Sequence, residues 1–137
     1  MQILLIEDNE GDVLLVRLAV AEASATASLH IARTGEEAIA MMEGSDFQPS
    51  LIILDLNLPR TTGTALLERW QGSAIPVVVF TSSQSDADKA RVLELGACEF
   101  VHKPQDLDAF VGAVGLIIER WAKAVHNRSQ MGAGAEP

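Results

Sequence analysis

The fold of this chain is constrained most by an alternation of short apolar runs with segments of helical length. Five such runs occur along the 137 residues, and each is followed by a segment long enough for a helix. This alternation predicts an α/β fold, because right-handed crossovers return the chain to a parallel sheet and leave helices on both faces. We therefore expect a doubly wound, five-stranded parallel sheet with five helices. The expected strands are 2–6, 28–32, 51–54, 76–80 and 99–102.

The apolar runs differ in how far they should be buried. Ile3–Ile6, Leu51–Leu54 and Val77–Phe80 are uniformly apolar, as expected for parallel strands covered on both faces. The run 28–32 is more polar, which is typical of an edge strand.

The segments between the runs carry apolar residues at helical spacing. In the first segment we expect Leu14, Leu15 and Leu18 to form the buried stripe. In the second, Thr34 followed by Glu37 three residues later predicts a capping box at the helix start. The inward face expected for the fourth segment consists of Ala87, Ala90 and either Leu93 or Leu95.

The last helix is expected at 107–125, about 28 Å long, which is more than the sheet below it needs. We assign 1–125 to one domain and 126–137 to a flexible tail, because the tail is small, polar and glycine-containing. We expect no output domain, because only about a dozen residues follow in this sequence. The surplus apolar stripe, with Trp121 and Val125, predicts a homodimer face shared with the fourth helix and fifth strand. A capped helix end with a loose tail is the alternative.

The composition narrows the classes of function. With 10 Lys and Arg against 19 Asp and Glu the net charge is −9, which argues against binding nucleic acid or an anionic membrane surface. Cys98 is the only cysteine, so we expect a reducing, cytoplasmic setting and a buried, unreactive thiol. No signal peptide or apolar run of membrane-spanning length is evident.

Charged side chains follow three of the expected strands at the point where each strand ends. Glu7 and Asp8 follow the first, Asp55 follows the third, and Lys103 follows the fifth. The carboxyl ends of parallel strands are where open α/β sheets bind ligands. Three carboxylates close together repel one another, and a divalent cation such as Mg²⁺ relieves the repulsion. The pattern predicts a site for a metal and a phosphoryl group, with Lys103 as the countercharge.

Thr81 and Ser82 follow the fourth expected strand. A hydroxyl at this position could donate a hydrogen bond to a phosphoryl oxygen. A turn or a helix cap explains Thr81 equally well when it is taken alone. The occurrence of polar residues at successive strand ends is what makes the pattern specific.

These residues resemble the receiver domain of bacterial two-component response regulators over about Gln2 to Trp121. The resemblance rests on Glu7-Asp8-Asn9, Asp55, Asn57-Leu58-Pro59 with Gly63, Thr81-Ser82 and Lys103-Pro104. It implies a flavodoxin-like fold with strand order 2-1-3-4-5. The Glu-Asp-Asn opening and Asp-Leu-Asn-Leu-Pro are similar to small stand-alone regulators paired with phytochrome-type photoreceptor kinases.

The resemblance also implies a role for each matching position. Asp55 would be the phosphoacceptor, and Asp8, Asp55 and the backbone carbonyl of Asn57 would bind Mg²⁺. Glu7 would hold a metal-bound water, while Thr81 and Lys103 would bind phosphoryl oxygens. The Lys103–Pro104 bond is expected to be cis. Phe100 stands where many receivers carry a switching aromatic residue, usually a tyrosine, and core packing explains it as well.

The function implied is that of a single-domain response regulator, a phosphoacceptor with slow autodephosphorylation rather than an enzyme. Its partner would be a histidine kinase, which the resemblance to the stand-alone regulators implies to be of phytochrome type, and its output face would be the fourth helix, fifth strand and fifth helix. Two alternatives stay open: a small Mg²⁺-dependent phosphatase with an aspartate nucleophile, and a degenerate receiver that acts as a constitutive binding module. A nucleotide-binding domain is disfavoured, because no glycine-rich loop follows the first strand.

Overall fold

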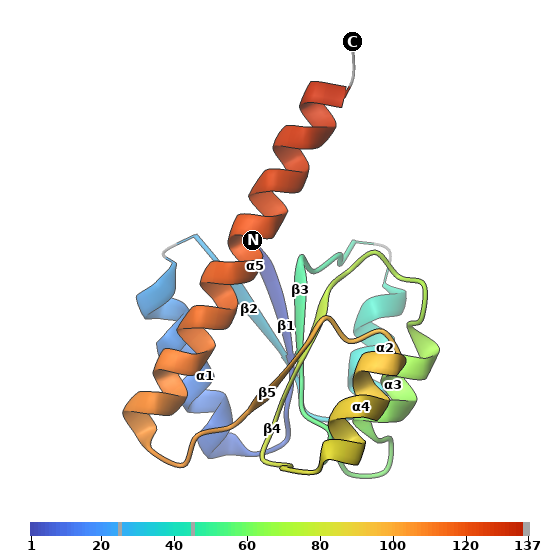
Figure 1. Cartoon of the computed structure of the whole chain (residues 1–137), viewed down its shortest axis with the longest axis vertical. Helices are drawn as coiled ribbons and strands as arrows, with labels where there is room; N and C mark the ends of the chain where they lie inside the picture. The colour runs from blue at the N-terminus through green and yellow to red at the C-terminus, as the bar shows by residue number, and fades with distance from the viewer. Residues whose placement is uncertain (25, 45, 136–137) are drawn as a thin grey trace.

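A computed structural model describes residues 1–24, 26–44 and 46–135, with side chains described as far as Trp121 except at the two gaps. Strands and helices alternate along the chain as expected (Figure 1). The strands are β1 (Gln2–Ile6), β2 (Ser28–Ala32), β3 (Leu51–Leu54), β4 (Val77–Thr81) and β5 (Glu99–His102). The helices are α1 (Glu10–Ala23), α2 (Gly35–Glu43), α3 (Gly63–Arg69), α4 (Asp86–Glu94) and α5 (Leu107–Ala135).

All five strands form one parallel sheet in the order β2-β1-β3-β4-β5. The predicted fold class and strand order are therefore confirmed. In the register of the central pair, Ile6 of β1 lies beside Leu54 of β3. Because these are the last residues of their strands, the residues that follow them come out at the same edge of the sheet.

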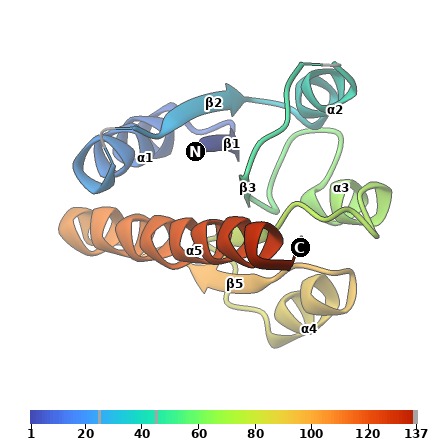
Figure 2. The ribbon, with the colours of Figure 1, turned by 90° about the horizontal axis from the view of Figure 1, so that it is seen from above.

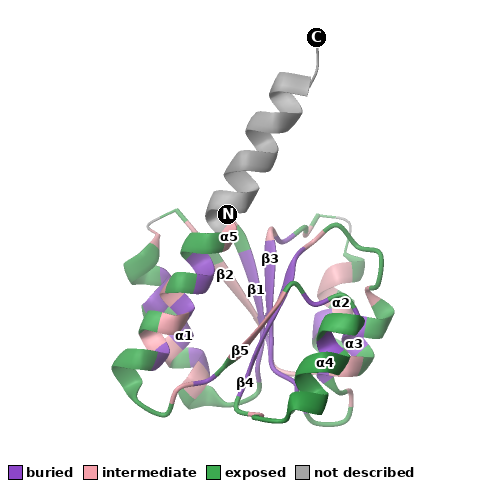
Figure 3. Cartoon of the chain, viewed as in Figure 1, coloured by how far each residue is buried: buried purple, intermediate pink, exposed green. Residues whose placement is uncertain are grey.

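Helices cover both faces of the sheet, as Figure 2 shows. The α1 and α5 helices pack on one face, and α2, α3 and α4 lie on the other. Every residue of β3 and β4 is buried between the two layers, whereas β2, at the sheet edge, is largely half-buried (Figure 3). This pattern matches the uniformly apolar central runs and the more polar edge run of the sequence.

Each of the five helices begins at a side chain that accepts a hydrogen bond from the backbone of the first turn. Thr34 caps α2 as expected, with its Oγ1 accepting from the Glu37 backbone N–H at 3.1 Å. The Glu37 carboxylate accepts from the Arg33 N–H rather than from that of Thr34, so the capping box is only half formed. The other capping residues are Asn9, Thr62, Ser85 and Asp106.

Two helices turn a different face inward from the one we expected. In α1 the buried residues are Val13, Val16, Ala19 and Val20, and Leu14 and Leu18 are 66% and 50% exposed. The valine–alanine stripe and the leucine stripe are both compatible with helical spacing. Small and β-branched side chains lie on the side that packs closely against the sheet.

The inward face expected for α4 is correct only for Leu95, one of the two leucines offered as alternatives. Val92 is its only buried residue, and Leu95 at its C-cap is buried too, while Ala87, Ala90 and Leu93 are exposed. Helix α4 therefore contributes little to the core. Cys98, in the turn that leads into β5, is exposed rather than buried.

The α5 helix runs to Ala135, past the end that we expected at Val125. Figure 1 shows it continuing beyond the edge of the sheet near which the N-terminus lies. In the tail predicted for 126–137 the side chains lie outside the described residues, and so do residues 136 and 137 entirely. The division of the chain at residue 125 therefore stays a prediction. No helix in the described part of the chain is both long and apolar enough to cross a membrane.

Gly63, the first residue of α3, allows that helix to approach the loop that follows β3. A Cβ atom at Gly63 would lie 2.7 Å from the carbonyl oxygen of Asp55 and 2.8 Å from Cα of Leu56. The Gly63 N–H also donates to the Leu56 carbonyl at 3.3 Å. The absence of a side chain here thus permits the close contact between α3 and the backbone that carries Asp55.

Candidate functional site

The charged residues singled out in the sequence converge at the carboxyl edge of the sheet. Glu7 and Asp8 follow β1, Asp55 follows β3, and Lys103 follows β5. Backbone hydrogen bonds continue the sheet pairing into this edge, from Glu7 N to the Ala32 oxygen at 3.0 Å and from Asp55 N to the Ile6 oxygen at 3.1 Å. The strands therefore determine where these side chains lie.

Three of the carboxylates form a group that could hold a metal ion. Glu7, Asp8 and Asp55 each offer an oxygen, and these oxygens lie within 4.8 Å of one another. Glu7 and Asp55 are buried, and Asp8 is exposed at the mouth of the group. An all-oxygen donor set of carboxylates, open to water on one side, suits a hard divalent cation such as Mg²⁺.

Lys103 lies among the carboxylates with its ammonium group almost fully buried. Its Nζ donates to Glu7 Oε1 at 2.5 Å, to Asp12 Oδ2 at 2.8 Å and to Asp55 Oδ2 at 3.3 Å. The ammonium thus links three elements of the chain, the ends of β1 and β3 and the first turn of α1. A buried amine with three carboxylate acceptors has a partner for each of its three N–H groups.

Asp12 is a member of this cluster that the sequence analysis missed. It lies in the first turn of α1, where its backbone N–H donates to the capping Asn9 side chain at 2.9 Å. The signal in the sequence was the spacing of Asn9 and Asp12, which is that of a capping side chain and the backbone N–H, three residues later, that donates to it. A capped helix that starts directly after β1 places its third residue close to the strand ends.

Burial and neighbouring charges both shift the pKa of two buried groups of the cluster, Glu7 and Lys103. Burial raises the pKa of Glu7 to about 7, and the nearby Asp55 carboxylate adds to the rise, although the Lys103 ammonium opposes it. Burial alone would lower the pKa of Lys103. Hydrogen bonds to Asp12 and Glu7, with the charges of Glu7 and Asp55, outweigh it and raise that pKa above its usual value. Lys103 therefore stays charged while Glu7 titrates near neutrality.

Thr81 and Asn57 lie at the same edge of the sheet as this cluster, whereas Phe100 lies within β5, beside Val79 of β4. Thr81 is the last residue of β4 and is fully buried, and its Oγ1 accepts from the Ser83 backbone N–H at 3.3 Å. The Asn57 N–H donates to Asp55 Oδ1 at 3.4 Å, which leaves the loop after β3 folded back on the carboxylate. Phe100, in β5, is half-buried against the core on the α4 side of the sheet.

The expected cis bond before Pro104 is wrong, since no peptide bond among the described residues is cis. Lys103 reaches all three carboxylates from a trans peptide. The cis isomer, which is the less stable one of an X–Pro bond, is not needed to direct this side chain.

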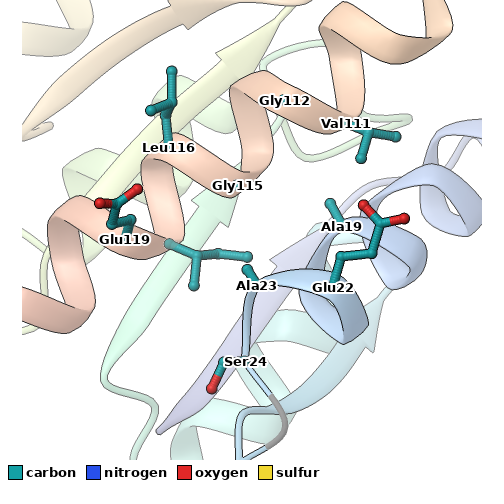
Figure 4. Close-up of a pocket in the computed structure, with 10 residues that line it drawn as sticks. Ala19, Glu22, Ala23, Ser24, Val111, Gly112, Gly115, Leu116 and Glu119 are labelled. Carbon is teal, nitrogen blue, oxygen red and sulfur yellow. The ribbon is translucent and has the colours of Figure 1, made fainter.

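A cavity of about 600 Å³ lies between α1 and α5, away from the charged cluster (Figure 4). It is lined mainly by small and apolar residues, with Glu22 and Glu119 at its rim. None of its lining residues belongs to the strand-end group, so the chemistry of the carboxylates rather than the size of a cavity locates the candidate site.

The fold and the site together define a doubly wound α/β protein with a carboxylate–lysine cluster at the point where the strand order reverses, between β1 and β3. Residues 3–115 match the family model of the response regulator receiver domain. The chain belongs to this family.

Several regulatory proteins are similar in sequence. A probable methanogenesis regulatory protein, FilR2 of Methanothrix harundinacea, is 32% identical over 127 residues, which cover 87% of this chain and 82% of that protein. The transcriptional regulatory protein PhoP of Escherichia coli K12 is 30% identical, over 88% of this chain and 53% of its own length. The chain thus spans about half of PhoP, and 18% of the protein RcaC of Microchaete diplosiphon, which is 31% identical.

Solved structures of two response regulators are similar over most of this chain. The phosphorylated cyanobacterial phytochrome response regulator RcpA superposes with a TM-score of 0.84 at 31% identity, over 90% of this chain and 94% of that one. The Mn²⁺-bound form of the response regulator Rcp1 gives a TM-score of 0.81 at 32% identity, over 88% and 93% of the two chains.

The raised pKa of Glu7 predicts how stability depends on pH when divalent cations are removed. Between pH 4.5 and about 7 the folded protein binds more protons at Glu7 than the unfolded chain does. The free energy of unfolding should therefore fall as the pH rises through this window, on the order of 1–3 kcal/mol in total. Urea unfolding in chelator at several pH values from 5 to 8 measures the slope.

The control is Glu7→Gln, which cannot titrate and should lose this part of the slope. Glu10 and Glu36 have lowered pKa values, so their contributions to the free energy of unfolding are lost only as the pH falls below 4.5. These contributions therefore do not overlap with the pH window in which Glu7 titrates. An equal fall in stability for wild type and Glu7→Gln between pH 5 and 7 would contradict the account.

Proposed function

We propose that this chain is the phosphoacceptor of a two-component system and that Asp55 receives the phosphoryl group from a phosphohistidine of a histidine kinase. The observation that carries the proposal is the Asp55 carboxylate itself. It lies in the group of three carboxylates suited to a divalent cation, and it accepts a hydrogen bond from the buried Lys103 ammonium. A nucleophile with a cation site on one side and a fixed positive charge on the other suits phosphoryl transfer.

The metal we propose is Mg²⁺. Asp8 and Asp55 would bind it directly with the backbone carbonyl of Asn57, and Glu7 would hold one of its waters. The acidic group of the structure and the Mn²⁺-bound form of Rcp1 support this assignment. Bound there, Mg²⁺ would neutralise negative charge on the incoming phosphoryl group.

The chain's own residues perform the transfer. An Asp55 carboxylate oxygen attacks phosphorus in line, forming an O–P bond as the N–P bond of the phosphohistidine breaks. The imidazole nitrogen leaves with the electron pair and is protonated. Lys103 and the Thr81 hydroxyl bind the phosphoryl oxygens. Water later hydrolyses the acyl phosphate, so the domain returns to its starting state slowly without being an enzyme for a separate substrate.

The acyl phosphate would act as a switch. It adds negative charge and new acceptors to the site, and the Thr81 hydroxyl would move toward them. Phe100 would follow Thr81, without the hydroxyl that a tyrosine would supply. The α4, β5 and α5 face would carry the output through protein contacts, since the acidic chain is unsuited to nucleic acid or to an anionic membrane.

The kinase we propose is of the phytochrome type, and the setting is the cytoplasm. The support is the similarity to RcpA and Rcp1 over nearly the whole domain, at 31% and 32% identity. Asp55 and Lys103 both lie at the carboxyl edge of the sheet, where a kinase histidine would have to approach.

Phosphoryl uptake from a small donor tests the acceptor. Incubation with acetyl phosphate and Mg²⁺ should add one phosphoryl group, detected by intact-protein mass. Asp55→Asn should abolish the added mass, because the amide is not a nucleophile, and chelation of Mg²⁺ should abolish it in the wild type. A persistent phosphoryl adduct in Asp55→Asn would place the acceptor at another residue.

The homodimer predicted from the sequence would use the α4, β5 and α5 face. Leu93 on α4 is 43% exposed, an apolar side chain that a partner would cover. Light scattering should show a mass that rises with concentration, more so with beryllium fluoride as a phosphoryl mimic. Leu93→Glu should lower the dimer fraction, whereas Leu14→Glu on α1 should not. A monomer at high concentration with and without the mimic would remove the dimer.

A further inference from the structure

The third carboxylate on Lys103 has no part in the proposed metal site. Asp12 accepts from Lys103 Nζ at 2.8 Å, a shorter contact than the 3.3 Å from Nζ to Asp55. The carboxylates that could hold a cation are Glu7, Asp8 and Asp55, and Asp12 is not among them. Its contact with the site is made through the ammonium group alone.

Asp12 is also held by a different part of the fold. It belongs to the first turn of α1, which the Asn9 cap fixes, whereas Lys103 follows β5. Its side chain is 26% exposed, compared with 3% for Glu7 and 8% for Asp55. Asp12 therefore lies on the outer side of the ammonium, with the two buried carboxylates on the inner side.

The ammonium has room to move on that outer side. A cavity of about 290 Å³ adjoins it, lined by Asp12, Ser82, Lys103 and Gln105 among others. A lysine side chain is a flexible four-carbon stem with a compact charge at its end. Without an anchor on the outer side, Nζ could rotate about its bond to Glu7 and into this space, away from Asp55.

We infer that Asp12 is a positioning residue for phosphoryl transfer, which holds the Lys103 ammonium so that its remaining N–H points at Asp55. This role rests on the phosphoacceptor function proposed above. With Glu7 and Asp12 as two fixed acceptors, the third N–H is directed to Asp55 Oδ2 before reaction and to a phosphoryl oxygen after it. A positively charged donor fixed in place in advance is what stabilises developing negative charge.

The rate of phosphorylation by acetyl phosphate at saturating Mg²⁺ tests the role. In this step an Asp55 oxygen forms a bond to phosphorus, the P–O bond to the acetyl group breaks, and acetate leaves with the electron pair. Asp12→Ala should slow the step about tenfold, as expected for the loss of one charge-assisted hydrogen bond. Asp12→Asn should stay within about twofold of wild type, because its amide oxygen accepts the same bond.

Two controls separate positioning from other effects. Glu10→Ala removes the same charge from the same helical turn, but Glu10 pairs with Arg33, so the rate should not change. Mg²⁺ affinity should be equal in Asp12→Ala and wild type, because Asp12 is outside the cation group. If Asp12→Ala fails to fold, Asp12→Ser, which is polar but too short to reach Nζ, takes its place and should be equally slow.

The outcomes distinguish this role from the function on which it rests. Wild type that takes up no phosphoryl group would overturn both. Uptake by wild type with an unchanged or faster Asp12→Ala would overturn the positioning role alone, as expected if Asp12 only repels the incoming anion. An Asp12→Asn variant as slow as Asp12→Ala would also overturn it, because charge rather than the hydrogen bond would then be the cause.

Discussion

The attraction between the buried Lys103 ammonium and the carboxylates around it is the interaction on which the rest of this site depends. Glu7 and Asp55 are brought to within reach of each other by the pairing of β1 and β3, and both are buried. Two buried carboxylates at such a separation repel each other, and desolvation adds to the cost. Lys103 offsets part of this free-energy cost. The pKa of Glu7 is still raised, because burial and the Asp55 charge together outweigh the effect of Lys103. A divalent cation would remove the remainder, so the site is built to favour one.

The sequence predicted the parts of the fold in which hydrophobic burial and strand ends decide the outcome. Uniformly apolar runs indicated strands covered on both faces, and their ends predicted where Glu7 and Asp55 would emerge. The inward face of α1 was mispredicted, because its valine–alanine and leucine stripes fit the helical period equally well. Which stripe packs depends on the space above the sheet, and a periodicity does not contain that information.

Asp12 was missed for a related reason. The three acids and the lysine that we identified all follow strands, and their convergence comes directly from a parallel sheet. Asp12 enters the cluster from a helix, and its distance from Lys103 depends on how closely α1 starts after β1 and on the cap at Asn9. The close approach at Gly63 is similar: the sequence shows a glycine, and only the packing of α3 on the Asp55 loop shows why.

Family membership and site geometry support the same account from independent directions. The family model covers residues 3–115, which include every residue of the carboxylate–lysine cluster. The similarity to FilR2, RcpA and Rcp1 extends over most of both chains, whereas PhoP is about twice as long as the matched region. What these proteins share with this chain is therefore the receiver domain.

The central claim is that separate stretches of the chain form one pocket that binds a cation next to Asp55. The thermal unfolding midpoint, measured with increasing Mg²⁺, tests it most directly. A ligand that binds only the folded state raises the midpoint with the logarithm of its concentration. We expect such a rise in wild type and a much smaller one in Asp8→Ala, which loses one oxygen of the group. An equal rise in both proteins, or none in wild type, would contradict the account.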